Sequence, residues 1–173
     1  MYTLRWAAAA TGSMPRRAAY LEHAGDEARH AKLFHRRAEE LAGPRAGLVA
    51  DAEDLFATLG ERRFLAFLEH AEGRGRREFE HYARAFGRAG DERTAALLRG
   101  IIHDENRHEQ NARALLEAEP GAGRARRYVR VWEAWRAARR GGRAVAEVVY
   151  LLLMLVLYPL LAPLALWERR RRA

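Results

Sequence analysis

The sequence predicts an all-α protein whose main part is a four-helix bundle. Three observations support this prediction. The helix-forming residues Ala, Leu, Arg and Glu dominate and β-branched residues are scarce. A short pattern, D-E-x-R-H, occurs at positions 26–30 and again at 104–108. Apolar residues make up 49% of the chain, which is enough to build a core in a domain of this length.

Turn-forming residues divide the first two-thirds of the chain, 1–119, into helical segments. We expect four helices, at 2–10, 14–42, 51–88 and 91–118. Gly43-Pro44 ends the second of them and Pro120-Gly121 ends the last, since neither pair continues a helix. Asp51 is the expected N-cap of the third helix.

The last third of the chain differs from the first two in composition. We expect a basic connector at 120–143 and a membrane-associated apolar helix with an arginine-rich end at 144–173. Residues 148–167 carry no charge, and this run has the length of a membrane span. A buried fifth helix is the alternative, and Pro159 and Pro163 leave a re-entrant or in-plane segment open.

The charge distribution favours a membrane partner over nucleic acid. The formal net charge is +8, but residues 120–173 hold 12 of the 31 basic residues and only 3 of the 23 acidic ones. The excess of positive charge therefore lies beside the apolar run, where basic residues flank membrane segments. The chain has no Cys, so His and carboxylates are the only strong metal ligands available.

The repeated pattern supplies a pair of candidate metal ligands from each of two helices. Glu27 and His30 stand at i and i+3 in the first copy, and Glu105 and His108 do so in the second. Side chains at this spacing share one helix face. Two Glu-x-x-His helices, with one further Glu from each of two other helices, hold two metal ions in four-helix bundles. Carboxylate oxygen with imidazole suits iron or manganese.

These segments resemble the rubrerythrin branch of the ferritin-like superfamily. The resemblance covers about residues 1–119 and implies a ferritin-like bundle with two iron ions, or manganese in their place. It also implies that Glu72 is the single-Glu ligand of the helix before the second motif, because Glu72 precedes Glu105 by about the length of one bundle helix and its turn. Glu69 fits this spacing less well. Gly75 stands where some members carry one more Glu, which departs from the family pattern.

The offset between the two motifs also predicts an internal duplication. The same offset relates Gly12 to Gly90. The counterpart of Glu72 would then precede Met1, so we expect the first helix of the bundle to be truncated and its ligand to be missing.

Other polar and aromatic residues of these helices are expected to support the centre. Asp26 and Asp104 can each hydrogen-bond a ligating His of the facing helix. Glu69, Tyr20 and Tyr82 are further candidates for positions around the ligands. The remaining histidines are expected as surface or supporting residues rather than ligands: His23, His35, His70, His81 and His103.

The resemblance implies a non-haem di-iron protein that reacts with peroxide, dioxygen or ferrous iron at a membrane surface. A membrane-bound hydroxylase of a lipid-soluble substrate and a non-catalytic, iron-binding or decayed bundle are the alternatives. We expect a homodimer, membrane lipid as a partner of residues 144–173, a bundle on the cytoplasmic side and no nucleic acid. Because the chain lacks Cys, electrons must come from a separate donor or from iron itself.

Overall fold

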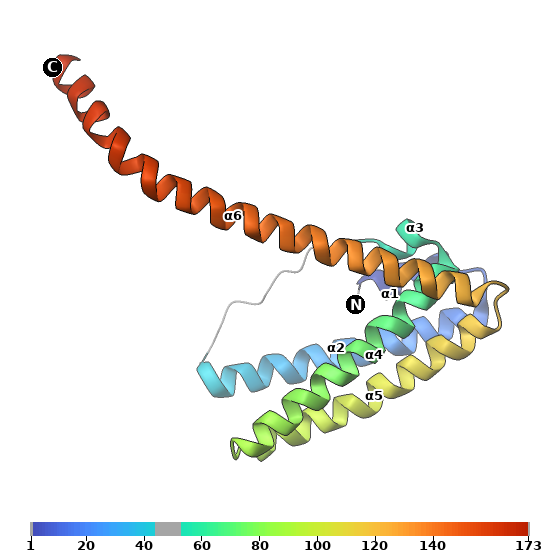
Figure 1. The fold of residues 1–173 in the computed structure, drawn as a ribbon. Helices are drawn as coiled ribbons and strands as arrows, with labels where there is room; N and C mark the ends of the chain where they lie inside the picture. The colour runs from blue at the N-terminus through green and yellow to red at the C-terminus, as the bar shows by residue number, and fades with distance from the viewer. Residues whose placement is uncertain (1, 44–52, 173) are drawn as a thin grey trace. The chain divides into compact units, whose positions relative to one another are not determined.

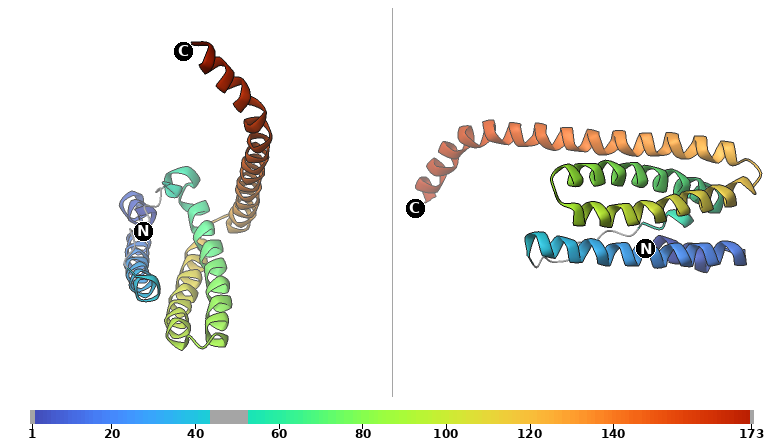
Figure 2. Two further views of the ribbon diagram at one scale, coloured as in Figure 1. Left: turned by 90° about the vertical axis from the view of Figure 1, so that its left-hand side faces the viewer. Right: turned by 90° about the horizontal axis from the view of Figure 1, so that it is seen from below.

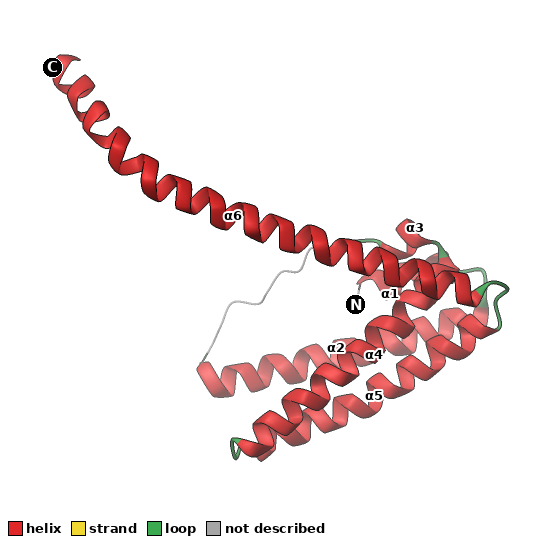
Figure 3. Ribbon diagram, viewed as in Figure 1, coloured by secondary structure: helices red, strands yellow, loops and turns green. Residues whose placement is uncertain are grey.

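The computed structural model describes residues 2–43 and 53–172. In these ranges every regular element is a helix and no strand occurs, which confirms the all-α prediction (Figure 3). The helices are α1 (Tyr2–Ala10), α2 (Met14–Ala42), α3 (Leu55–Leu59), α4 (Glu61–Arg88), α5 (Glu92–Glu117) and α6 (Ala122–Arg172). Three of the predicted helices, 2–10, 14–42 and 91–118, agree with α1, α2 and α5 to within one residue at each end.

Side-chain caps explain where the two motif-bearing helices begin. The Ser13 hydroxyl accepts a hydrogen bond from the backbone N–H of Arg16 at the start of α2. At the start of α5 the Asp91 carboxylate accepts one from the backbone N–H of Thr94, at 3.0 Å. Each cap satisfies a backbone donor that has no partner inside the helix. Ser13 and Asp91 are separated by the same offset as the two motifs, so the duplication extends to the helix starts.

The predicted helix at 51–88 is wrong in one respect, because Gly60 divides it into α3 and α4. Gly60 has φ +71°, a backbone conformation that glycine adopts far more readily than other residues. The side chain of Asp54 caps α3 by accepting from the backbone N–H of Ala57. The expected cap, Asp51, lies outside the described residues.

The helices of the first compact unit, Met1–Arg130, run antiparallel in pairs. Figures 1 and 2 show α4 and α5 as a hairpin that turns through Gly90, where φ is +80°. The short α1 lies alongside α2 and runs in the opposite direction. Since α2 also packs against α5, the two helices that carry the D-E-x-R-H motifs face each other.

An apolar core lies at the end of this unit where α1 meets α2. Tyr20 of α2 contacts the Phe56 and Phe64 rings edge-on, with ring centroids 6.3 and 5.7 Å apart. Leu65 and Leu116 are fully buried in the same cluster. Ala125 and Val129, in the first turns of α6, also belong to this core. The polar motifs lie further along α2 and α5, so packing at one end of the unit holds the metal-ligand candidates in register.

The second compact unit, Val131–Ala173, consists of the rest of α6. The structure shows one helix from Ala122 to Arg172 and no break between the predicted connector, 120–143, and the predicted apolar helix, 144–173. Apolar side chains of this helix are exposed, Leu151 and Leu155 among them. The expected membrane-spanning helix is not supported: in the described part of the chain, no helix combines the length and the apolar character that crossing a membrane requires.

Candidate metal centre

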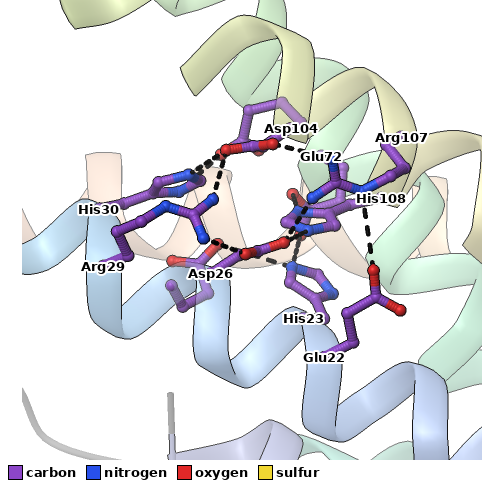
Figure 4. Close-up of polar contacts among 11 residues, drawn as sticks. Glu22, His23, Asp26, Arg29, His30, Glu72, Asp104, Arg107 and His108 are labelled. Carbon is purple, nitrogen blue, oxygen red and sulfur yellow. Dashed lines mark hydrogen bonds and ion pairs between the residues drawn. The ribbon is translucent and has the colours of Figure 1, made fainter. Parts of the chain in front are cut away.

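The candidate centre lies where α2 faces α5, with α4 beside them (Figure 4). Glu27 and His30 come from α2, Glu72 from α4, and Glu105 and His108 from α5. The structure therefore brings all five sequence-predicted ligands together. Both histidines, Glu72 and Glu105 are at least nine-tenths buried, whereas the Glu27 side chain remains one-third exposed. Buried carboxylates need compensation by protons, hydrogen bonds or cations.

Each D-E-x-R-H motif positions the histidine of the other motif. Nε2 of His30 lies 3.0 Å from a carboxylate oxygen of Asp104, and Nε2 of His108 lies 2.9 Å from one of Asp26. With Nε2–H donated to the aspartate, the lone pair of each ring lies on Nδ1. Nδ1 of His30 is 3.6 Å from Glu105, and Nδ1 of His108 is 4.0 Å from Glu72. Both ring nitrogens available to a metal therefore face glutamate oxygens.

Two arginines of the same motifs pair with both aspartates. Arg29 donates to Asp26 at 2.6 Å and to Asp104 at 2.7 Å. Arg107 contacts the same two carboxylates, at 2.6 Å and 2.9 Å. Burial alone would raise the pKa of Asp26, but hydrogen bonds from His108, Arg29 and Arg107 outweigh it and hold that pKa at about 2. Both aspartates therefore stay ionised and orient the histidines at neutral pH.

The candidate ligands form two groups that share one residue. The first group comprises four side chains: His23, Glu27, Glu72 and His108. The second comprises three: Glu27, His30 and Glu105. In each group the ligand atoms lie within 4.8 Å of one another. Opposite ligands of a six-coordinate ion are roughly 4.2 Å apart when each bond is about 2.1 Å, so small side-chain adjustments suffice to bind an ion.

Two buried nitrogen atoms in this centre show that the residues fit metal ions. Nδ1 of His108 and Nε2 of His23 are buried and have no hydrogen-bond partner among the residues that the structure describes. An orphaned buried polar atom destabilises a fold unless something satisfies it. Imidazole nitrogen together with carboxylate oxygen is a donor set for iron, manganese and similar divalent ions. Glu27 belongs to both groups, so its carboxylate could help to hold either ion.

Glu105 and His23 retain protons in the metal-free chain. Burial, together with the nearby ionised Glu72, raises the pKa of Glu105 well above neutrality. Burial alone would lower the pKa of His23, but the adjacent Glu27 and Glu72 carboxylates raise it to about 9. At pH 7 the metal-free centre therefore carries one proton on the carboxyl pair and another on His23.

The other sequence-predicted residues lie at various distances from the centre. Glu69 pairs with Arg113 and Arg126, at 3.0 and 2.6 Å, instead of with a candidate ligand. Tyr20 is buried in the aromatic core, and burial raises the pKa of its hydroxyl. Tyr82 is half exposed on α4, almost three helical turns beyond Glu72.

His23 is the residue that sequence reasoning missed. It was expected to support the centre or lie at the surface, yet the structure places it in the first group of ligand atoms. The available indication was its spacing, since His23, Glu27 and His30 follow one face of α2 at intervals of four and three residues. Gly75 also lies at the centre, because a Cβ atom there would be 3.6 Å from an oxygen of Glu105.

Comparison with known proteins gives one family. A family model described as rubrerythrin matches residues 6–116, a range that contains all of these candidate ligands. No curated protein and no solved structure matches the chain.

The Asp–His contacts predict that Asp26→Asn weakens metal binding. An asparagine cannot accept from His108 and both arginines as a carboxylate does, and losing such a partner of a ligating histidine typically costs ~10–100-fold in metal affinity. Competition with a chelator measures this loss. Glu40→Gln is the matched control, since Glu40 is a carboxylate of α2 that pairs with Arg37 and Arg93 away from the centre. Equal affinities for the two variants would contradict the positioning role of Asp26.

The protons of the centre predict pH-dependent metal binding. Divalent ions displace them, so loading at pH 7 should release about two protons per chain, one from the Glu72–Glu105 pair and one from His23. Because both pKa values are raised, affinity should fall by up to ~100-fold for each unit that the pH drops from 8 to 6. Titration calorimetry in two buffers of different ionisation enthalpy counts the protons. Metal binding without proton release would contradict this account.

Proposed function

Because the chain belongs to the rubrerythrin family, we propose that it is a non-haem di-iron protein that reacts with peroxide, dioxygen or ferrous iron. One observation carries the proposal: two groups of candidate ligands overlap at Glu27. Such a shared carboxylate is what a pair of neighbouring ions requires, because it bridges them and offsets their mutual repulsion.

Each side chain has a definite role in this proposal. His30 and Glu105 would hold one ion, Glu72 and His108 would hold the other, and Glu27 would contribute to both. Asp26 and Asp104 keep Nε2–H of the histidines engaged, so that Nδ1 is directed at the ions. When bound, two ferrous ions supply the two electrons that convert peroxide to water.

One of the spaces beside the centre has room for a small oxidant. A cavity of about 20 Å³ is lined by His23 and His108 on one side and by Tyr20, Leu65 and Leu68 on the other. A water molecule needs roughly 10–15 Å³ of such space, so the cavity holds one molecule of about that size. This space fits peroxide or dioxygen, while a separate hollow of about 400 Å³ lies beside His30 and Asp104.

We also propose partners for this chain, on the basis of its composition. With no Cys in its sequence, the chain has no thiolate ligands for an electron-transfer iron site, so a separate donor or ferrous iron supplies the electrons. We also propose a homodimer, with the bundle on the cytoplasmic side of a membrane whose lipid contacts residues 144–173. Exposed apolar side chains on α6, such as Val149 and Leu155, and the arginine-rich end support the membrane contact.

Iron loading tests the proposed centre. The purified chain, loaded anaerobically with ferrous iron, should bind about two ions, as expected for a bundle of this class. The double variant Glu105→Ala/His108→Ala should bind fewer, because it removes one candidate ligand from each group. Peroxide or dioxygen added to the loaded chain should then oxidise the iron faster than free ferrous iron. Two bound ions without faster oxidation would favour the non-catalytic, iron-binding alternative.

Vesicle flotation tests the membrane contact. The full chain should float with vesicles that contain anionic lipid, since its apolar and arginine-rich residues at 144–173 both favour such a surface. A chain shortened after Arg143 should stay at the bottom of the gradient. If both chains float equally, the contact does not depend on residues 144–173.

A further inference from the structure

We propose that His23 is itself a metal ligand, through Nε2, and that it gives the ion at Glu72 and His108 a second imidazole. This inference rests on the proposed di-iron function and goes beyond the Glu-x-x-His ligands. The ion at His30 and Glu105 then has one imidazole, so the two metal positions are chemically different. Figure 4 shows the His23 side chain beside His108 and Glu72.

The position of the His23 ring supports coordination. The ring is 7% exposed and stacks on the ring of His108, with centroids 3.9 Å apart. Its Nε2 atom lies 3.2 Å from Glu72 and 3.5 Å from Glu27. Neither contact has the alignment of a hydrogen bond, and Nε2 has no other partner. This nitrogen, the two carboxylates and the His108 ring each offer a ligand atom, and these atoms lie within 4.8 Å of one another, close enough to share one ion.

The internal duplication shows that packing does not require a histidine here. The offset that relates Asp26 to Asp104 also relates His23 to Ile101 of α5, which is 2% exposed. The equivalent position in the other half of the bundle is thus filled by an apolar side chain. A buried polar ring costs free energy unless its polar atoms are satisfied. Among the described residues, Nε2 of His23 makes ion pairs with Glu27 and Glu72 but no aligned hydrogen bond, and a metal ion held by the same carboxylates would satisfy it.

The second imidazole also predicts a difference in metal preference. Imidazole favours cobalt, nickel and zinc more strongly than it favours manganese, whereas carboxylates suit manganese. The position with His23 and His108 should therefore take up cobalt before the position with His30. Glu27 belongs to both positions, so filling the first prearranges its carboxylate for the second.

Cobalt binding to the full chain tests this proposal, with His23→Ile as the main variant because isoleucine is the residue at the related position. Competition against a chelator gives the affinity of each ion, and NMR of the cobalt form counts the shifted ring N–H signals of ligating histidines. His35→Ile is the matched control: His35 pairs with Glu39 at the same i,i+4 spacing on α2, at 3.3 Å, but is exposed. His23→Gln is a second variant, which keeps a polar side chain of similar size.

We expect two cobalt ions and three histidine signals for the unchanged chain and for His35→Ile. Both His23 variants should lose one signal and bind the first ion at least ~100-fold more weakly, since losing an outer partner alone costs ~10–100-fold. Metal should also raise their melting temperature less than it raises that of the unchanged chain. A purely structural role would shift the metal-free and loaded forms equally, and the unchanged chain and its variants would all show the same two signals.

Two other results overturn the proposal in different ways. If the unchanged chain shows two signals and both His23 variants bind two ions with unchanged affinity and the same two signals, His23 is not a ligand and the proposed di-iron function stands. If the unchanged chain binds no divalent ion, the proposed function fails and the role of His23 fails with it.

Discussion

The centre depends on the crossed hydrogen bonds between α2 and α5, in which Asp26 holds His108 and Asp104 holds His30. An imidazole binds a metal through one nitrogen, and its direction is set by what the other nitrogen donates to. Here that acceptor belongs to the opposite helix, so neither histidine is oriented until the helices are in register. The caps at Ser13 and Asp91 determine where each helix begins, and core packing at one end of the unit holds the helices together outside the centre.

Charge explains why the two arginines belong to the repeated motif. Two aspartates and three glutamates meet at a largely buried site, and like charges in such a place repel strongly. Arg29 and Arg107 each contact both aspartates, so that part of the charge is balanced within the protein. The glutamates are left with a shared proton and a protonated His23, both of which divalent ions displace. The aspartates, which the arginines neutralise, thus orient the histidines, while the glutamates are left to bind metal.

The features that could be predicted from the sequence are those set by local chemistry. Capping residues and Gly or Pro turns located α1, α2 and α5, and the i,i+3 spacing identified Glu27 with His30 as a pair. The break at Gly60 was missed, because a single glycine within a helical pattern can be tolerated or can adopt a positive φ. The location of His23 depends on α4 and α5, which bring Glu72 and His108 to it. A helix face alone does not distinguish such a residue from a surface histidine.

Positions at which the two halves of the bundle differ say more about function than positions at which they agree. The repeat makes the surroundings of His30 and His108 equivalent, down to their aspartate partners. A fully symmetric centre would hold two equal ions, whereas here His23 corresponds to Ile101 and only one half of the centre has a second imidazole. The small cavity adjoins this same half, against His23 and His108. An oxidant in that cavity would approach the metal position with more nitrogen ligands, whereas the larger hollow of about 400 Å³ beside His30 and Asp104 adjoins the other position, so the two positions differ both in their ligands and in the space beside them.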